Sequence, residues 1–287
     1  MSAPMSPQEQ GPTTRDDHWQ RHATQWDRVG RPLRPSPEDV AFTERAIARR
    51  RGEIPGDGFR ALMLGVTPEL ALMRWPQGTT LVAIDHSPAM IRHVWPNAAL
   101  PDTARAVCGR WEHLPVGSAE MDAVIGDGFY TPLAYPSGYT RVGREIRRVL
   151  KTDGVYVARA FIRPKNTERP SSVFDALRSG QINNFHAFKL RLAMALQESA
   201  ARGVRLSDIW TTWHRCVPDA DALARSLRWS IDEIATIDAY RDSNACYTFP
   251  TIDELRDVLS LHFIEPECHV PDYELGVRCP TFVLRPK

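Results

Sequence analysis

Two short apolar runs in the sequence end at residues that could bind a nucleotide, one at a glycine and the other at a carboxylate. A short helical segment separates the two runs. The first run, residues 61–64, ends at Gly65, and the second, residues 81–84, ends at Asp85. If the runs are neighbouring parallel strands, their carboxyl ends share one sheet edge, where a bend without a side chain lets a nucleotide approach the backbone. A carboxylate there can accept hydrogen bonds from both ribose hydroxyls. We therefore predict that Asp85 is a functional residue.

Composition bounds the class of protein. The chain has 287 residues, 43% of them hydrophobic, which suggests one large domain or a core with one substantial addition. Its formal net charge is +1, so the basic excess of a nucleic-acid surface is missing and we expect no nucleic-acid partner. The five cysteines are widely spaced and odd in number, which favours a reduced, cytoplasmic protein without a disulfide framework.

Two further expectations are negative. No His or Cys spacing is typical of a zinc site, so we expect no metal. No segment has the length and apolar character of a membrane span or a secretory signal, so we expect no membrane partner.

A polar tail and a helical preface come first. Residues 1–15 are rich in Pro, Ser, Gln and Thr, and we predict that they are disordered. Residues 16–51 carry a helical pattern, with Trp19, His22, Trp26 and Val29 at three- to four-residue spacing. Ser36 is a predicted N-cap, with Pro37 at the first position of a helix that runs to about residue 51.

Short apolar runs then alternate with helical or loop segments between residues 52 and 161. This alternation predicts an α/β fold whose strands are buried on both faces. A helix over residues 139–150 leads into the last of these runs, with Gly154 at the turn. The expected strands are residues 61–64, 81–84, 104–108, 121–125 and 154–161.

The chain changes character between residues 162 and 249, where helical periodicity dominates, notably over residues 187–202 and 220–239. A helix capped by Thr251, with Glu254 at the reciprocal position, follows. We expect the sheet to resume after it, over residues 262–270 and 277–284.

In order and spacing, these segments resemble the class I S-adenosylmethionine-dependent methyltransferases. The resemblance covers about residues 59–161 and 251–286. It implies a three-layer α-β-α Rossmann-like fold with a mostly parallel seven-stranded sheet and a helical insertion after strand five. The pieces that carry it are Leu64-Gly65, residues 84–91 (IDHSPAMI), residues 108–115 (CGRWEHLP), residues 121–127 (MDAVIGD) and residues 144–154 (REIRRVLKTDG).

The resemblance also implies a division of the chain. Residues 16–51 would form a helical lid, and residues 162–249 would cover the substrate. Residues 52–161 and 250–287 would form the cofactor-binding core.

The first loop departs from the family pattern. Met63 stands where an acidic residue is common, and Val66-Thr67-Pro68-Glu69 replaces further glycines. Thr67 and Pro68 can begin a helix whose free backbone N–H groups face the carboxylate of the cofactor. Glu69 and backbone carbonyls near Gly65 are candidates for receiving its ammonium group. The lack of G-x-G-x-x-G argues against a nicotinamide enzyme.

By resemblance, the cofactor is S-adenosylmethionine and its product S-adenosylhomocysteine. Asp85 would accept hydrogen bonds from the ribose, His86 and Met90 would lie beside the adenine, and Arg110 and Trp111 would flank its amine. The expected cofactor-binding residues are Gly65, Val66, Thr67, Glu69, Asp85, His86, Met90, Arg110, Trp111, Asp127 and Gly128.

The acceptor side is less specific. Asp127 and Tyr130 are candidate bases, as is a histidine of the insertion. Residues 127–130, Asp-Gly-Phe-Tyr, lack the prolines of the Asn/Asp-Pro-Pro-aromatic box, so a nucleobase or amine acceptor does not follow.

The expected function is methyl transfer to oxygen, nitrogen or sulfur of a small molecule by in-line displacement. The alternative is an inactive cofactor-binding scaffold or accessory subunit. The sequence leaves open whether the protein is a monomer or a homodimer, whether Asp85 is only a helix cap, whether Trp111 only packs in the core, and whether Arg31 or Arg34 contacts a carboxylate.

Overall fold

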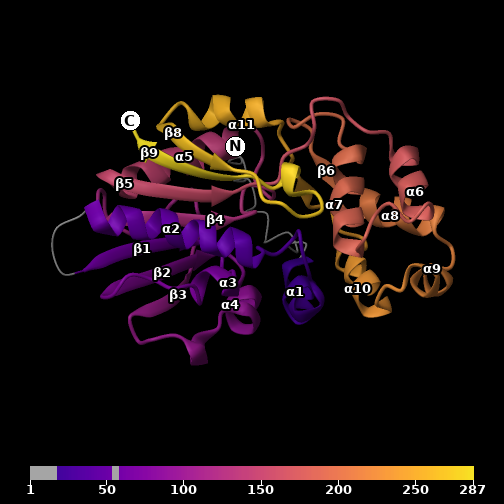
Figure 1. Ribbon diagram of the computed structural model, residues 1–287, viewed down its shortest axis with the longest axis horizontal. Helices are drawn as coiled ribbons and strands as arrows, with labels where there is room; N and C mark the ends of the chain where they lie inside the picture. Colours follow the sequence, from indigo (N-terminus) through magenta and orange to yellow (C-terminus); the bar gives the residue numbers. More distant parts are fainter. Residues whose placement is uncertain (1–17, 54–57) are drawn as a thin grey trace, which may run out of the picture.

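One seven-stranded sheet organises the molecule (Figure 1), in a computed structural model that describes residues 18–53 and 58–287. The tail predicted to be disordered, residues 1–15, lies outside the described residues. The strand order is β3-β2-β1-β4-β5-β9-β8, and β9 runs in the opposite direction to the other six strands of this sheet. The strands are β1 (Phe59–Leu64), β2 (Thr79–Asp85), β3 (Ala104–Cys108), β4 (Met121–Asp127), β5 (Leu150–Arg159), β8 (Phe263–His269) and β9 (Thr281–Pro286).

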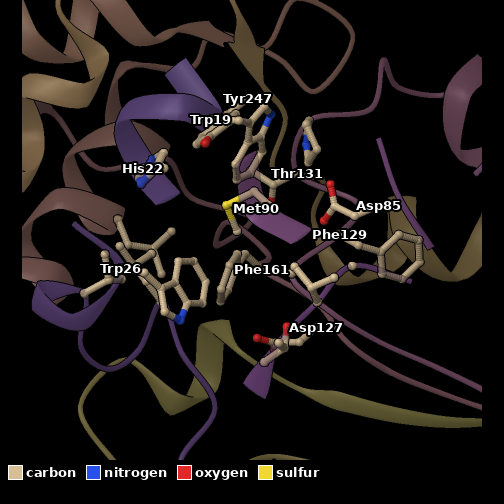
Figure 2. A pocket seen from close by; sticks show the side chains of 18 of the residues that line it. Trp19, His22, Trp26, Asp85, Met90, Asp127, Phe129, Thr131, Phe161 and Tyr247 are labelled. Atoms are coloured by element: carbon tan, nitrogen blue, oxygen red, sulfur yellow. The ribbon is translucent and has the colours of Figure 1, made fainter. Parts of the chain in front are cut away.

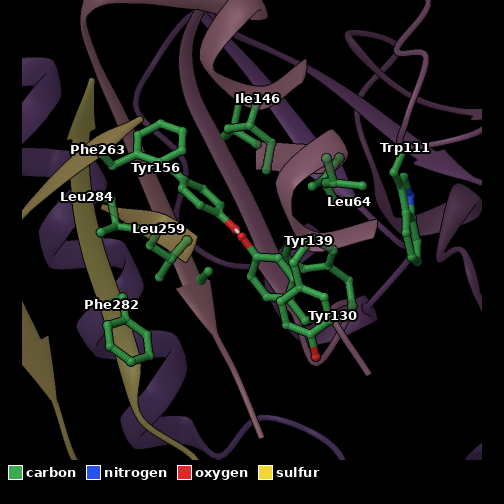
Figure 3. Packing of buried hydrophobic residues seen from close by; sticks show 14 of the residues in the cluster. Leu64, Trp111, Tyr130, Tyr139, Ile146, Tyr156, Leu259, Phe263, Phe282 and Leu284 are labelled. Carbon is green, nitrogen blue, oxygen red and sulfur yellow. Dashed lines mark hydrogen bonds between the residues drawn. The ribbon is translucent and has the colours of Figure 1, made fainter. Parts of the chain in front are cut away.

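Helices cover both faces of the sheet, which confirms the three-layer prediction. Alternate residues of a strand point to opposite faces, so β1 contributes Ala61 and Met63 to one apolar core and Leu62 and Leu64 to the other. The first face is covered by α2 (Pro37–Glu53), α3 (Pro68–Ala71) and α4 (Pro88–Val94). The second face packs against α5 (Ser137–Val149) and α11 (Ile252–Leu259), as Figure 3 shows around Ile146 and Leu259.

Register brings the ends of the central strands to one edge. Leu64 of β1 is paired with Ile84 of β2 and with Gly126 of β4. The next residues along these strands, Gly65, Asp85 and Asp127, therefore lie side by side at the carboxyl edge.

Two of the predicted helix starts are confirmed, and a third lacks the expected cap. At the start of α2, Ser36 Oγ accepts a hydrogen bond from the N–H of Asp39 at 3.1 Å. Asp39 Oδ2 in turn accepts one from the N–H of Ser36 at 2.7 Å. Thr251 and Glu254 form the same reciprocal box at α11. Thr67 precedes α3 and Pro68 occupies its first turn, but the Thr67 side chain makes no capping bond.

The inserted helices between β5 and α11 form a second body with its own apolar core, beyond the carboxyl ends of the parallel strands (Figure 1). Helix α1 (His18–Thr24) lies between the two bodies and packs against α4 and the 3₁₀ helix η3. The elements of the insertion are α6 (Pro170–Arg178), α7 (Phe185–Leu196), β6 (Val204–Arg205), α8 (Leu206–Cys216), α9 (Ala220–Leu227), α10 (Ile231–Ala235), η3 (Thr236–Tyr240) and β7 (Cys246–Tyr247).

Several predicted boundaries in these parts were wrong. The helix expected over residues 187–202 ends at Leu196, where the buried side chain of Gln197 exchanges hydrogen bonds with the backbone of Phe249. The helix expected over residues 220–239 breaks at Arg228, which adopts a left-handed conformation, and restarts when Ser230 caps α10.

Two shorter elements also differ from the sequence predictions. The preface pattern from Trp19 to Val29 is split between α1 and a 3₁₀ turn, η1 (Trp26–Arg28). Part of the last predicted strand is another 3₁₀ turn, η4 (Gly276–Arg278).

No helix within residues 18–53 and 58–287 has the length and apolar character needed to cross a membrane.

Candidate functional site

A cavity opens at the carboxyl edge of the sheet, between the strand ends, the preface and the insertion (Figure 2). The space between atoms there, open solvent included, amounts to about 940 Å³. Gly65, Asp85 and Gly128 line it from the sheet, Trp26 from the preface and Tyr240 from the insertion. Such a mostly apolar hollow with a few polar groups is typical of a small-molecule site.

Gly65 and Asp85 meet in this cavity. Gly65 has φ +90°, and a Cβ built on it would lie 3.9 Å from Asp85 Oδ2. The backbone N–H of Gly65 donates to Ile84 O at 2.8 Å, which fixes the bend beside the carboxylate. The two residues therefore line the same cavity, and their role in one binding site stays a prediction.

Asp85 is buried but only partly engaged. Its Oδ1 accepts from the N–H of Ser87 at 2.8 Å. Burial raises the pKa of the carboxyl to about 6, and the backbone N–H groups of Ser87 and His86 oppose that rise. The cap of α4 is Ser87, whose Oγ accepts from the N–H of Met90. Since Asp85 does not cap α4, its carboxylate is available to a ligand in the cavity.

Trp111 both packs in the core and lines the cavity. Its Nε1 donates to Ile84 O at 2.7 Å, which fixes the indole next to the end of β2. The ring meets Phe129 edge-on at 5.6 Å between centroids. Met90 lines the cavity from α4, and Val66 and Thr67 line it from the first loop. The two interpretations of Trp111 left open by the sequence are therefore compatible.

Asp127 lines the cavity but is held by an ion pair. Arg159 Nε lies 2.5 Å from Asp127 Oδ1, and both side chains are buried. The same guanidinium donates to Pro32 O at 2.9 Å and to the Tyr273 hydroxyl at 3.0 Å. This network ties the end of β4 to the preface, so Asp127 is a positioned carboxylate rather than an unengaged base.

Gly128 continues the cavity wall at φ +59°. A Cβ on this residue would lie 2.7 Å from the Phe161 ring, so only glycine lets that ring approach.

Four predicted site residues lie outside the cavity lining. Glu69 turns to the preface, where its Oε1 pairs with Arg34 Nε at 2.6 Å. The Arg110 side chain is 64% exposed and lies 4.0 Å from Glu112. His86 lies at the rim, edge-on to Trp19 and Trp111.

Tyr130 is the fourth, and its position corrects the catalytic prediction. It belongs to the core between the sheet and helices α5 and α11, where it stacks on Tyr139 and its hydroxyl accepts from Tyr156 at 2.9 Å (Figure 3). Burial raises its pKa. Tyr130 comes after the turn at Gly128, and its side chain points into the core instead of the cavity. It therefore does not reach an acceptor in the cavity.

Lys189 is a cavity residue that the sequence analysis missed. It belongs to α7, is 1% exposed, and donates from Nζ to Thr236 Oγ1 at 3.0 Å. Its ammonium lies 5.8 Å from the Phe185 ring centre and 5.2 Å from that of Tyr240. Burial lowers its pKa to about 7. One signal was available: Lys189 stands in a largely apolar run, residues 185–196, whose other polar residues are His186 and Arg191.

His22 joins Lys189 at the same part of the cavity. The sequence analysis placed it on the apolar face of the preface but gave it no role. Its pKa is lowered by burial and then by the positive charge of Lys189. Its buried Nδ1 has no hydrogen-bond partner within residues 18–53 and 58–287.

Metal ligands do not gather in the described part of the chain. Within those same residues, no group of three His, Cys, Asp or Glu side chains could hold a metal ion.

Residues 62–158, which span most of β1 through β5, match a family model described as a methyltransferase domain. Together with the sheet order and its single antiparallel strand, this match shows that residues 62–158 belong to a methyltransferase domain and that the fold is the Rossmann-like methyltransferase fold. No curated protein matches the sequence significantly.

Solved structures share the architecture over most of their length. The CcbJ methyltransferase of Streptomyces caelestis is 15% identical, with a TM-score of 0.53 and coverage of 94% of this chain and 97% of that chain. An S-adenosylmethionine-dependent methyltransferase of Methanosarcina mazei is 14% identical, with a TM-score of 0.50 and coverage of 88% and 99%.

A third similar structure carries a different name. It is a proposed Zn-dependent alcohol dehydrogenase of Rhodobacter sphaeroides, 14% identical, with a TM-score of 0.59 and coverage of 95% of this chain and 98% of that chain. At such low identity, these three likenesses establish the fold alone.

Proposed function

We propose that this protein transfers a methyl group from S-adenosylmethionine to a small molecule that enters the cavity. One observation carries the proposal: a single cavity is lined by the sheet edge, the preface and the insertion. Gly65 and Asp85 line it from the sheet edge, Trp26 from the preface and Lys189 from the insertion. One part of this hollow suits an adenosyl group, and the rest offers room for an acceptor.

The residues at the sheet edge fit an adenosyl group. A Cβ on Gly65 would lie 3.9 Å from Asp85 Oδ2, at van der Waals distance, so the bend and the carboxylate adjoin each other at the cavity. Asp85 can accept hydrogen bonds from ribose hydroxyls, which also offset the cost of burying its charge. Met90 and Trp111 supply apolar surface beside it.

Methyl transfer from S-adenosylmethionine requires little acid or base catalysis from the protein. S-adenosylmethionine supplies a methyl group already activated by a positively charged sulfur. The chain then has to hold the acceptor in line and exclude water. Trp26, Phe161 and Phe249 enclose the cavity from three parts of the chain, so an acceptor between them would be desolvated.

A small acceptor is favoured over a macromolecule by this enclosure. The acceptor part of the hollow lies between α1 and the insertion rather than in an open groove along the sheet. A base or side chain of a polymer would have to pass between these elements. Oxygen, nitrogen and sulfur acceptors all remain within the proposal.

Calorimetry with S-adenosylmethionine and S-adenosylhomocysteine tests the cofactor assignment. We expect both to bind, and Asp85→Ala to weaken binding about 10-fold or more, because one residue receives both ribose hydroxyls. The matched control is Asp102→Asn, since Asp102 is an exposed carboxylate. No heat with either ligand would overturn the enzyme proposal and favour the scaffold alternative.

A further inference from the structure

Two nitrogen-bearing side chains gather at the part of the cavity remote from Asp85. Figure 2 shows His22 and Asp85 on opposite sides of the cavity, with Met90 and Phe161 between them. Lys189 lies at the same end as His22, because both side chains contact Tyr240: the ammonium is 5.2 Å and the His22 ring 5.5 Å from the centre of the tyrosine ring. If the adenosyl group occupies the Asp85 end, Lys189 and His22 belong to the acceptor end.

Lys189 has unused hydrogen-bonding capacity. An ammonium group carries three N–H donors, and the hydroxyl of Thr236 accepts one. Within residues 18–53 and 58–287, no carboxylate forms an ion pair with Lys189. Burying a cation without a counter-charge is costly, so an anion entering this end of the cavity would be strongly favoured.

The neighbours of Lys189 supply no negative charge. His22 of α1 and His186 of α7 both have lowered pKa values, in each case through burial first and Lys189 second. Burial raises the pKa of Tyr240 from η3, which keeps that hydroxyl neutral. Among the residues that the structure describes, none supplies a counter-charge for the ammonium form of Lys189, and an anionic ligand would supply one.

The walls around this end are aromatic. Tyr240, Tyr247 and Phe249 of the insertion line the cavity, with Trp26 of the preface and Phe161 after β5. Flat, apolar surfaces of this kind pack well against a ring. Aromatic walls, together with a cation that has no carboxylate partner among the described residues, favour a ligand that is both aromatic and acidic.

We propose that the methyl acceptor is a small phenol whose ionised oxygen pairs with Lys189 Nζ, with His22 Nδ1 as a second polar contact. This inference rests on the proposed function, because it names the substrate class of the same cavity. An aromatic carboxylate would share the oxyanion, and the experiment below separates the two. Loss of the phenolic proton to solvent accompanies binding, and the ammonium of Lys189 keeps its own proton.

4-Nitrophenol is a direct probe, because its phenolate and phenol forms absorb differently. It is added to the protein saturated with S-adenosylhomocysteine, at a pH below the pKa of the free dye. We expect binding with an increased phenolate fraction. Lys189→Met should reduce affinity about 10-fold or more and abolish the phenolate signal, whereas Lys189→Arg, which keeps a permanent charge, should retain that signal.

Controls separate this inference from the proposed function. Lys165→Met is the matched variant, because Lys165 is exposed and pairs with Asp253 on the surface. Affinity for S-adenosylhomocysteine, measured separately on each variant, reports whether the cofactor end is intact. If the wild-type protein does not bind S-adenosylhomocysteine, the proposed function is contradicted. The phenolate signal of 4-nitrophenol, measured without cofactor, still tests whether Lys189 binds a phenol.

Two results would overturn the phenol assignment. One is unchanged dye affinity in a Lys189→Met variant that still binds S-adenosylhomocysteine. The other is Lys189-dependent binding of 4-nitrobenzoate when the dye does not bind, which would assign the pocket to aromatic carboxylates.

Discussion

Gly65 and Asp85 end two adjacent strands and face each other so closely that a Cβ on Gly65 would lie 3.9 Å from Asp85 Oδ2. The bend at φ +90° leaves the space in front of the carboxylate clear. Since L side chains rarely adopt that φ, glycine serves both the backbone conformation and the opening of the cavity.

Gly65→Ala should therefore act on stability and on binding together. We expect a loss of about 1–2 kcal/mol in the free energy of unfolding from the left-handed backbone, with weaker S-adenosylhomocysteine binding because the methyl group enters the space beside Asp85. Urea denaturation and calorimetry measure the two effects. Gly52→Ala is the control: Gly52 lies in α2 with nothing near its Cβ and no positive φ, so we expect a gain of about 0.5–1 kcal/mol. Wild-type affinity in Gly65→Ala would contradict the role given to this bend.

Asp85 should make cofactor affinity depend on pH. Its pKa is raised to about 6 from the ordinary value of 3.8, so the carboxylate that accepts from a ribose is lost as pH falls through 6. We expect affinity for 5′-methylthioadenosine, which lacks the titrating amino-acid part of the cofactor, to be level above pH 7 and to fall by up to about 10-fold per unit below 6. Asp85→Asn should bind weakly with a flat profile. A flat wild-type profile would remove Asp85 from the ribose contact.

The same shift has a consequence for the ligand-free protein. A carboxyl whose folded pKa exceeds its unfolded pKa stabilises the fold at low pH, and that contribution is lost as pH rises from about 4 to 6. Asp85→Asn should remove this dependence. Unfolding free energies of the two proteins, measured in urea across this pH range, should therefore diverge as pH rises, with the variant the more stable above pH 6.

The sheet was predictable because its strands are short apolar runs. The prediction for β3 matches at both ends, residues 104–108. Others were predicted too short, because their ends carry polar or small residues, such as Thr79 and Thr80 in β2 and Gly126 in β4. Hydrophobic pattern identifies the buried centre of a strand, but hydrogen bonding to a neighbour extends it further.

The site was predictable only where strand ends define it. The location of Asp85 at the cavity follows from its place at the end of a parallel strand and does not depend on which side chains surround it. Tyr130 was misplaced, since which face receives a residue after a turn depends on the backbone of Gly128. Lys189 was missed because α7 is buried on almost every side, and periodicity does not say which tertiary partners surround its lysine.

Glu69 offers a test of the sequence prediction that it receives the ammonium group of the cofactor. The carboxylate pairs with Arg34 and lies outside the cavity lining. We expect Glu69→Gln to change S-adenosylmethionine affinity by less than about threefold, and to lower stability by roughly 1 kcal/mol because the pair is partly buried. Calorimetry and thermal unfolding give the two numbers. A loss of affinity for S-adenosylmethionine but not for 5′-methylthioadenosine would restore the ammonium role.

The buried pair Asp127–Arg159 should behave as a unit. Arg159→Met leaves Asp127 buried without its cation, with Asp39 Oδ2 also only 4.0 Å from the former guanidinium. We expect that variant to lose about 3–5 kcal/mol in the free energy of unfolding, and the double variant Asp127→Asn, Arg159→Met to lose less than the sum of the single losses, because it removes both charges together. Urea denaturation of the four proteins gives the coupling energy. Strictly additive losses would mean that the two charges contribute separately to stability, and that Asp127 and Arg159 do not act as a unit.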